Sequence, residues 1–247
     1  MNAAPPRIFA PHRRRARWNR MIAQRETGTA AGWLLREMAA DIAERAAFMQ
    51  LRPARSLILG DASEALGGAL PGEVIAANPA TLDEEQPLPA GPFDLIASIG
   101  LIDTVNDLPG ALVHIRNALA PEGVAILTCL GAGSLPRLRA ALLAADGDRP
   151  AARIHPQLDS KAAAGLLQRT GFSRQVSDSH GIDVSYTSLD RLVTDLRDQG
   201  QQGALASSPP PLTRQQWDKA RSAFLADANE RGRVSERFEL LTLTGWR

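Results

Sequence analysis

The sequence predicts an α/β fold with a mostly parallel sheet. Short apolar runs of buried-strand length alternate along the chain with segments in which apolar residues have helical spacing. One run, Leu57 to Leu59, ends at Gly60 and enters a turn of small residues, the layout of the first strand–helix turn of a doubly wound sheet. The chain has 247 residues, of which 44% are hydrophobic and 22% charged, which suits one globular domain of this class.

The first half of the chain predicts one helix and three strands. Residues 27–49 carry apolar side chains at helical spacing, which indicates an amphipathic helix. A strand is expected over residues 56–60 and a second over residues 73–78, which Pro79 ends. The run 93–99 is apolar throughout and has the length of a buried strand.

The second half continues the alternation. Asp107 is a suitable N-cap for the helix that follows it, and residues 124–130 form another buried strand. A polar loop rich in Gly, Gln, Ser and Pro, residues 200–211, separates two helices that precede the last strand. The remaining helices are expected over residues 134–145, 159–170, 188–199 and 213–229, and the remaining strands over 172–179 and 238–244.

These elements predict a single domain, residues 27–247, with a helical insertion over residues 186–235. Residues 1–26 form a basic arm whose arginines gather over positions 13–20. We interpret it as a solvated arm, because prolines at positions 5, 6 and 11 should interrupt a helix. The protein is then cytoplasmic. An arginine-rich leader directing it to the mitochondrial matrix is the alternative.

Composition narrows the function classes. The formal net charge is +1 and aromatic residues make up 4% of the chain, so neither a global basic field nor a base-stacking surface favours nucleic-acid binding. The single cysteine, Cys129, excludes an internal disulfide, and the four histidines show no metal-ligand spacing. No stretch reaches the roughly 18 apolar residues of a membrane span.

A set of motifs recurs along nearly the whole chain: Arg7-Ile8-Phe9 and residues 93–98, 105–112, 119–123, 131–135, 166–172 and 243–246. Together they resemble the class I S-adenosylmethionine-dependent methyltransferases. Within that superfamily they resemble the complex I assembly factor 5 group and the malonyl-carrier-protein methyltransferases. The resemblance implies a Rossmann-like sheet with an antiparallel last hairpin, S-adenosylmethionine as cofactor, and a protein or carrier-protein substrate.

The departures from that family fall on the cofactor site. Its first loop reads acid-x-Gly-x-Gly-x-Gly, and here Ile58, Ala62 and Glu64 replace the acid and the last two glycines. Asn78 replaces the acid that grips the ribose hydroxyls. Only four residues separate Asn78 from Asp83, too few for a crossover helix and a third strand, so that unit is expected to be missing.

The resemblance implies six cofactor-binding residues and leaves the catalytic residues unknown. Asp83, Glu84 and Glu85 resemble a cluster that meets adenine, and a solvated loop is the alternative interpretation. Asp103-Thr104 replaces a His-Trp pair of the family. The candidates are Gly60, Asp61, Asn78, Asp83, Glu84 and Ser98.

Two functions therefore compete. The first is an active methyltransferase, which needs mainly the alignment of a nucleophile with the cofactor's sulfonium. The second is a non-catalytic binding or assembly module that keeps the fold, a pseudoenzyme. Glu64 favours the second, because a carboxylate in place of glycine adds bulk and negative charge beside the cofactor's own carboxylate. We expect S-adenosylmethionine to bind weakly or not at all.

Overall fold

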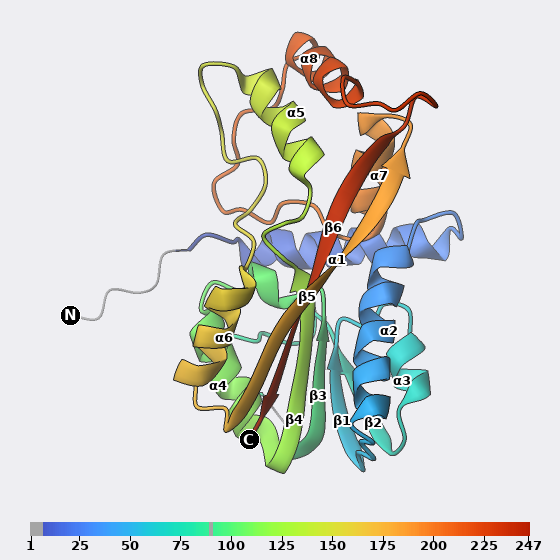
Figure 1. Ribbon diagram of the computed structural model, residues 1–247. Coiled ribbons are helices and arrows are strands. Elements are labelled where there is room, and N and C mark those ends of the chain that lie inside the picture. Colours follow the sequence, from blue (N-terminus) through green and yellow to red (C-terminus); the bar gives the residue numbers. More distant parts are fainter. Residues whose placement is uncertain (1–6, 89–90) are drawn as a thin grey trace, which may run out of the picture.

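A six-stranded mixed sheet forms the centre of the computed structural model, which describes residues 7–88 and 91–247 (Figure 1). The strand order is β2-β1-β3-β4-β6-β5. The first four strands are parallel, and β6 is antiparallel to both of its neighbours. The strands are β1 (Arg55–Leu59), β2 (Glu73–Ala77), β3 (Phe93–Ile99), β4 (Leu119–Leu130), β5 (Arg174–Tyr186) and β6 (Val234–Trp246). The mostly parallel sheet with an antiparallel last strand is thus confirmed.

Helices cover both faces of this sheet. α2 and α3 lie on one side, and α4 and α6 on the other (Figure 1). The described helices are α1 (Pro11–Glu26), α2 (Trp33–Phe48), α3 (Ala65–Ala69), α4 (Leu108–Ala118), α5 (Pro136–Asp146), α6 (Ser160–Arg169), α7 (Leu189–Asp198) and α8 (Arg214–Leu225), with a 3₁₀ turn η1 (Ile102–Thr104). None of them is long and apolar enough to span a membrane.

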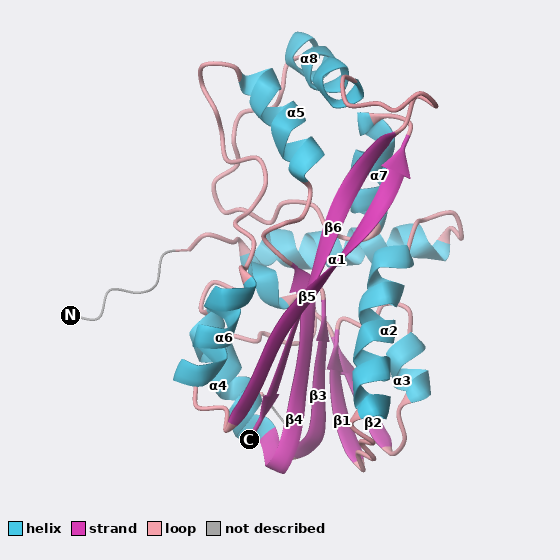
Figure 2. Cartoon of the chain, viewed as in Figure 1, coloured by secondary structure: helices cyan, strands magenta, loops and turns pink. Residues whose placement is uncertain are grey.

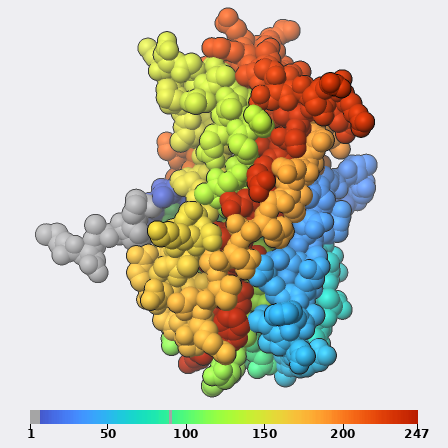
Figure 3. Space-filling view, viewed as in Figure 1, coloured from blue at the N-terminus to red at the C-terminus, as the bar shows by residue number. Residues whose placement is uncertain are grey.

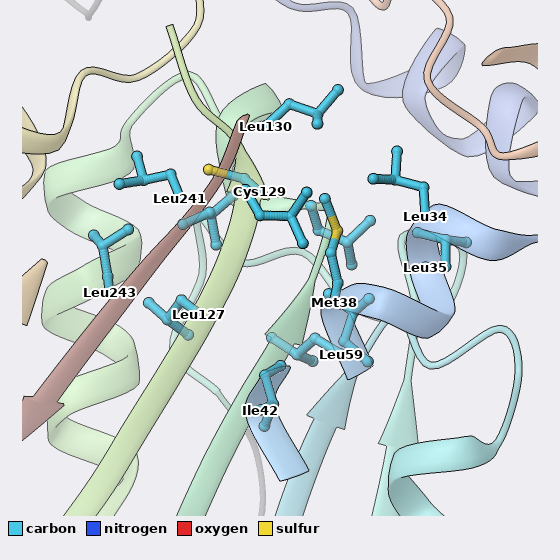
Figure 4. Close-up of a cluster of buried hydrophobic side chains, with 14 of the residues drawn as sticks. Leu34, Leu35, Met38, Ile42, Leu59, Leu127, Cys129, Leu130, Leu241 and Leu243 are labelled. Atoms are coloured by element: carbon cyan, nitrogen blue, oxygen red, sulfur yellow. The ribbon is translucent and has the colours of Figure 1, made fainter. Parts of the chain in front are cut away.

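One part of the core lies where α2 packs on the sheet. Leu34, Met38 and Ile42 follow one another at intervals of four residues, so they share one face of the helix, and all three are fully buried. Figure 4 shows this face turned toward strand residues such as Leu59 and Leu127. The strand side chains are aliphatic and equally buried, as expected for a sheet covered on both faces.

The third strand of the family's sheet is missing, as the sequence predicts. β2 is the edge strand and pairs in parallel with β1. Between β2 and β3, the described residues 78–88 and 91–92 contain turns and no strand. A short turn stands there instead, closed by the bonds from the backbone N–H groups of Thr81 and Leu82 to the carbonyl of Asn78.

A long hairpin carries the helical insertion. β5 and β6 pair over their whole length, from Arg174 opposite Trp246 to Tyr186 opposite Val234. Their upper part extends beyond the sheet, and α7 and α8 follow one another in the connection between them (Figure 2). Both strands are longer than the expected 172–179 and 238–244, because the hairpin continues into the insertion.

The interpretation of the basic segment as a solvated arm is wrong for residues 11–26. Pro11 begins helix α1 instead of interrupting one, because the first helical position needs no backbone N–H and suits the fixed φ of proline. α1 crosses the carboxyl ends of the parallel strands (Figure 1) and buries Arg14, Arg17, Trp18 and Met21. The prolines at positions 5 and 6 lie outside the described residues.

Candidate functional site

A cleft of about 560 Å³ lies where β1 and β2 end and α1 crosses above them. This edge of a parallel sheet is the general ligand-binding edge of open α/β folds, and the volume is within the range of small-molecule sites. The lining comes from α1, the loop after β1 and the turn after β2. Its residues are Trp18, Asn19, Ile22, Ala23, Glu26, Asp61, Ala62, Glu64, Ala76, Ala77, Asn78, Ala80 and Thr81.

Gly60 keeps the conformation that the loop after β1 requires. Its φ is +85°, and a Cβ there would lie 2.7 Å from the carbonyl oxygen of Ile99. Its N–H donates to the carbonyl of Ala77 at 2.9 Å, which ties the loop to the end of β2. Only glycine tolerates both the positive φ and the lack of space for a Cβ. The backbone therefore requires glycine here whether or not a ligand binds.

Glu64 occupies a glycine-type conformation without being glycine. It precedes α3 with φ +56° and ψ +10°, in the left-handed region that costs an ordinary residue roughly 1–2 kcal/mol. Its exposed side chain lines the cleft. The loop therefore keeps the backbone path of a glycine-rich turn, while a carboxylate stands where the family has a hydrogen atom.

Asp61 and Asn78 meet at this cleft, and both side chains hold the backbone of their own loops. Asp61 Oδ2 accepts from the N–H of Gly67 at 2.9 Å, and its other oxygen accepts from the Ser63 hydroxyl. Asn78 Oδ1 accepts from the N–H of Ala80 at 2.9 Å, a local turn motif of asparagine. The structure thus brings Gly60, Asp61 and Asn78 together at one sheet edge.

Asp83, Glu84 and Glu85 lie in different environments, which neither the adenine contact nor the solvated loop predicts. Asp83 is exposed, but Glu84 is buried and pairs with Arg14 of α1 through both of its carboxylate oxygens, each at 2.6 Å. Glu85 accepts from the N–H of Asn106 at 2.7 Å. A solvated loop is therefore wrong for Glu84, whose carboxylate holds α1 in place. Neither Asp83 nor Glu84 lines the cleft.

Ser98 also lies away from the cleft lining. It sits in β3 with no exposed surface, and its hydroxyl has no partner among the described residues. Its carbonyl accepts from the hydroxyl of Thr128 on the neighbouring strand. The side chain is therefore part of the packed sheet.

A buried polar network beneath α1 was not anticipated from the sequence. Arg14 Nε and Arg17 Nη2 both reach the Thr104 hydroxyl, at 3.1 and 3.3 Å. His155 Nε2 lies within hydrogen-bond distance of Asp103 Oδ2, at 3.1 Å. The one signal that pointed here is the polar pair Asp103-Thr104 directly after an apolar strand.

Charges inside this network shift one another's pKa. Burial alone would raise the pKa of Asp103, but the hydrogen bond with His155 and the charges of Arg17 and Arg14 outweigh it and leave the pKa below its usual value. Burial lowers the pKa of Arg17 to about 10, against the opposing effect of Asp103. Burial also acts against the charge of Arg14, but the bond to Glu84 prevails and raises its pKa.

Residues 26–175 match the family model of a methyltransferase domain. The chain belongs to the methyltransferase domain family. It is 28% identical over 190 residues to "Arginine-hydroxylase NDUFAF5, mitochondrial" of Rattus norvegicus, covering 75% of this chain and 55% of that protein. The corresponding Homo sapiens protein is 31% identical over 170 residues, 67% of this chain and 49% of that protein.

A bacterial relative and a solved structure extend the comparison. The chain is 27% identical over 165 residues to "Malonyl-[acyl-carrier protein] O-methyltransferase" of Laribacter hongkongensis, covering 66% of this chain and 54% of that protein. It spans about half the length of these curated relatives. The crystal structure of YcgJ from Bacillus subtilis shares the fold, with a TM-score of 0.51 at 10% identity, covering 86% of this chain and 98% of that one.

S-adenosylmethionine is the cofactor that this family implies, and its amino-acid end is the part that the cleft residues do not fit. The lining carries three acids, Glu26, Asp61 and Glu64, and no arginine or lysine. Arg25 of α1 interacts electrostatically with Asp61 from outside the lining. The Asn78 oxygen already accepts a backbone hydrogen bond, and the nearby Glu84 is neutralised by Arg14. The acidic lining is therefore unfavourable for the cofactor's carboxylate.

Proposed function

We propose that this methyltransferase-family protein binds S-adenosylmethionine weakly or not at all and works as a non-catalytic module that binds a protein or carrier-protein partner. Assembly of respiratory complex I is the setting that the resemblance to assembly factor 5 implies. The cytoplasm is the proposed location, and the mitochondrial matrix is the alternative because the relatives from rat and human are named mitochondrial.

The observation that carries this proposal is the Glu64 carboxylate on the cleft wall. A cofactor carboxylate brought beside it would meet a like charge while both lose water, which is costly without a cation to pair them. Asn78 adds a second loss, since an amide replaces a charge-assisted contact to the ribose. Two such losses of roughly 1.5–3 kcal/mol each would weaken a micromolar site to about millimolar.

Calorimetric titration of the wild type tests the proposal. We expect a Kd for S-adenosylmethionine of about 1 mM or weaker, as the two losses above imply. Glu64→Gly should restore binding at least tenfold, and Glu64→Gln, which keeps the bulk and removes the charge, separates the two effects. 5′-Methylthioadenosine lacks the amino-acid end, so Glu64 should not discriminate against it, and its affinity should change little in either variant.

A repaired cleft gives a second test. Ala62→Gly, Glu64→Gly and Asn78→Asp restore three family positions at once. Ile58 is left unchanged because it is buried in β1, where a new carboxylate would unfold the sheet. If the repaired protein binds at micromolar Kd and the wild type does not, the loop is the cause. If neither binds, the missing third-strand unit explains the loss.

An active methyltransferase is the alternative, and two observations favour it. The cleft keeps a ligand-sized volume, and Gly60 keeps the backbone turn. Micromolar binding of S-adenosylmethionine by the wild type would overturn the pseudoenzyme proposal and establish this alternative in its place.

A further inference from the structure

A cavity of about 230 Å³ lies beyond the end of β4, between α5, α7 and the loops around residues 153–157 and 201–203. In Figure 3 the yellow-green residues of α5 and the red residues of α8 form the upper end of the molecule, and the cavity belongs to that end. It shares no lining residue with the cleft under α1. A ligand bound in this cavity would therefore be distinct from one bound in the cleft.

The wall of this cavity is largely aliphatic. Half of its lining residues are Leu, Ile or Val, and none is Phe, Tyr or Trp. Leu130, Leu138 and Leu196 are 2%, 6% and 6% exposed, so solvent barely reaches this part of the wall. Such a surface favours a methylene chain, whose apolar area it removes from water, and offers no ring for a flat ligand to stack on.

The formal charges on the lining come from two arginines. Arg153 and Arg197 line the cavity, and no Asp or Glu does. Arg153 is already neutralised, because Asp146 pairs with it at 2.6 Å. Arg197 is exposed in the last turn of α7, and its guanidinium has no hydrogen bond or ion pair within residues 7–88 and 91–247. One cation of the lining is therefore uncompensated.

Arg197 can pair with a ligand at the open side of the cavity. It is exposed while the leucines of the wall are buried, so it marks the side that faces solvent. No partner holds its guanidinium elsewhere, so pairing with a ligand breaks no existing contact. Asp103, which lies behind His155 and outside the lining, has the charges of Arg17 and Arg14 beside it. An anion at the open side therefore meets a cation and no uncompensated acid.

We propose that this cavity binds a short-chain aliphatic carboxylate, whose methylene chain lies against the leucines and whose carboxylate pairs with Arg197. The planar guanidinium of arginine suits a carboxylate, because it can donate two parallel hydrogen bonds to it. A volume of about 230 Å³ suits a chain of about eight carbons, since an engineered apolar cavity of about 150 Å³ holds benzene. The proposal does not depend on S-adenosylmethionine binding, and the acidic lining of the cleft should reject the same ligand.

Chain length tests whether the cavity encloses the ligand. Calorimetric titration of the wild type with butanoate, hexanoate and octanoate should show affinity rising about fourfold per methylene, which corresponds to ~0.8 kcal/mol for each CH₂ buried. The gain should stop between octanoate and dodecanoate, because further methylenes lie outside the cavity. No saturable binding by octanoate would overturn the proposal. A steady gain through dodecanoate would place the chain on an open surface and contradict it equally.

The head group tests the pairing with Arg197. Octanoate should bind about tenfold more tightly than octan-1-ol, the difference expected for one hydrogen-bonded contact between charged groups. Octylamine has the same chain and a cationic head, so it should bind more weakly than the alcohol. Equal affinities of the three compounds would show that the cavity does not recognise the carboxylate, and the proposal would be wrong.

Variants locate the binding. Arg197→Gln should reduce the affinity for octanoate to that for octan-1-ol and leave octan-1-ol unchanged. Arg191→Gln is the matched control, the same change at an exposed arginine of α7 outside the lining, and should alter neither. If Arg197→Gln binds octanoate as the wild type does, the assignment of the carboxylate is refuted.

A filled cavity gives the last test. Val193→Phe narrows the cavity from α7 and should abolish binding of both octanoate and octan-1-ol. Val113→Phe is its control, because Val113 is 37% exposed on α4 and lies outside the lining. Undiminished binding by a folded Val193→Phe protein would place the ligand elsewhere. If that variant fails to fold, the chain-length profile of the wild type still decides whether the ligand is enclosed.

Discussion

At the scale of single residues, the interior holds charges that the sequence pattern does not reveal. Arg14 and Glu84 are 70 positions apart, and their bidentate pair is buried on both sides. Glu64, in contrast, is visible from the sequence because it replaces a glycine of a known loop. A substitution within a local motif can be predicted from the chain, whereas a pairing across the fold depends on how α1 docks.

Breaking the buried Arg14–Glu84 pair should lower the free energy of unfolding strongly. Glu84→Gln is expected to destabilise the protein by about 3–5 kcal/mol, since it leaves the Arg14 guanidinium without its counter-charge. Asp227→Asn is the control, because Asp227 and Arg137 are paired at the surface with both side chains nearly half exposed, and its cost should stay under about 1 kcal/mol. Urea denaturation of the two variants measures the difference. Similar losses in both would contradict this view of the pair.

Asp103 should make the protein acid-sensitive. Its pKa in the folded state lies below the usual 3.8, so as pH falls the unfolded chain takes up the proton first. The stability from this group is fully present well above pH 3.8 and is lost below it, down to the folded-state pKa. Denaturation midpoints measured from pH 7 to pH 2 should fall more steeply in the wild type than in Asp103→Asn. Parallel profiles would show that other carboxylates dominate.

At the scale of elements, the sequence predicts those helix and strand boundaries that nearby residues determine. Asp107 was expected to cap a helix, and its Oδ1 accepts from the N–H of Gly110 at 2.9 Å at the start of α4. β5 was expected to be short, because most of its side chains are exposed and show no apolar run. Its strand conformation comes from pairing with β6 instead. α1 was missed because a proline at the first helical position resembles an interruption.

Removing the cap should have a modest and local effect. Asp107→Ala is expected to cost about 1 kcal/mol, because it frees a backbone N–H in the first turn of α4. Asp107→Ser should recover most of that loss, since serine is an equally good cap. Thermal and urea denaturation measure both variants. A loss of more than about 3 kcal/mol would indicate that Asp107 does more than cap the helix.

At the scale of the whole molecule, the alternation of strands and helices predicts the mostly parallel sheet, and the four residues between Asn78 and Asp83 predict the missing third strand. The order of the strands is known only from the folded chain. The sequence predicts the sheet edge where the cleft lies but not the element that covers it, because α1 is expected to be a solvated arm. A cavity of about 230 Å³ between α5, α7 and two loops was not predicted either, because these segments meet only in the folded chain.

We expect the basic segment not to bind nucleic acid, because the fold uses several of its arginines internally. Arg14 and Arg17 point inward, and Arg13 bonds to the carbonyl of Leu205, which leaves Arg15 and Arg20 exposed on α1. Affinity for duplex DNA should be negligible and unchanged by Arg15→Ala and Arg20→Ala together. Fluorescence anisotropy at low and high salt checks this. Tight binding with a steep salt dependence would contradict it.

The docking of α1 also determines the order in which the molecule can be completed during synthesis. Arg13 bonds to Leu205 across 192 positions, and Arg17 bonds to Gln202 across 185. At a translation rate of about 5–20 residues per second, α1 waits roughly 10–40 s for these partners. Throughout that interval Trp18 and Met21 have no finished surface to cover. Until then the growing chain exposes the face of α1 that becomes buried in the folded protein, where Trp18 and Met21 lie beside Arg14 and Arg17.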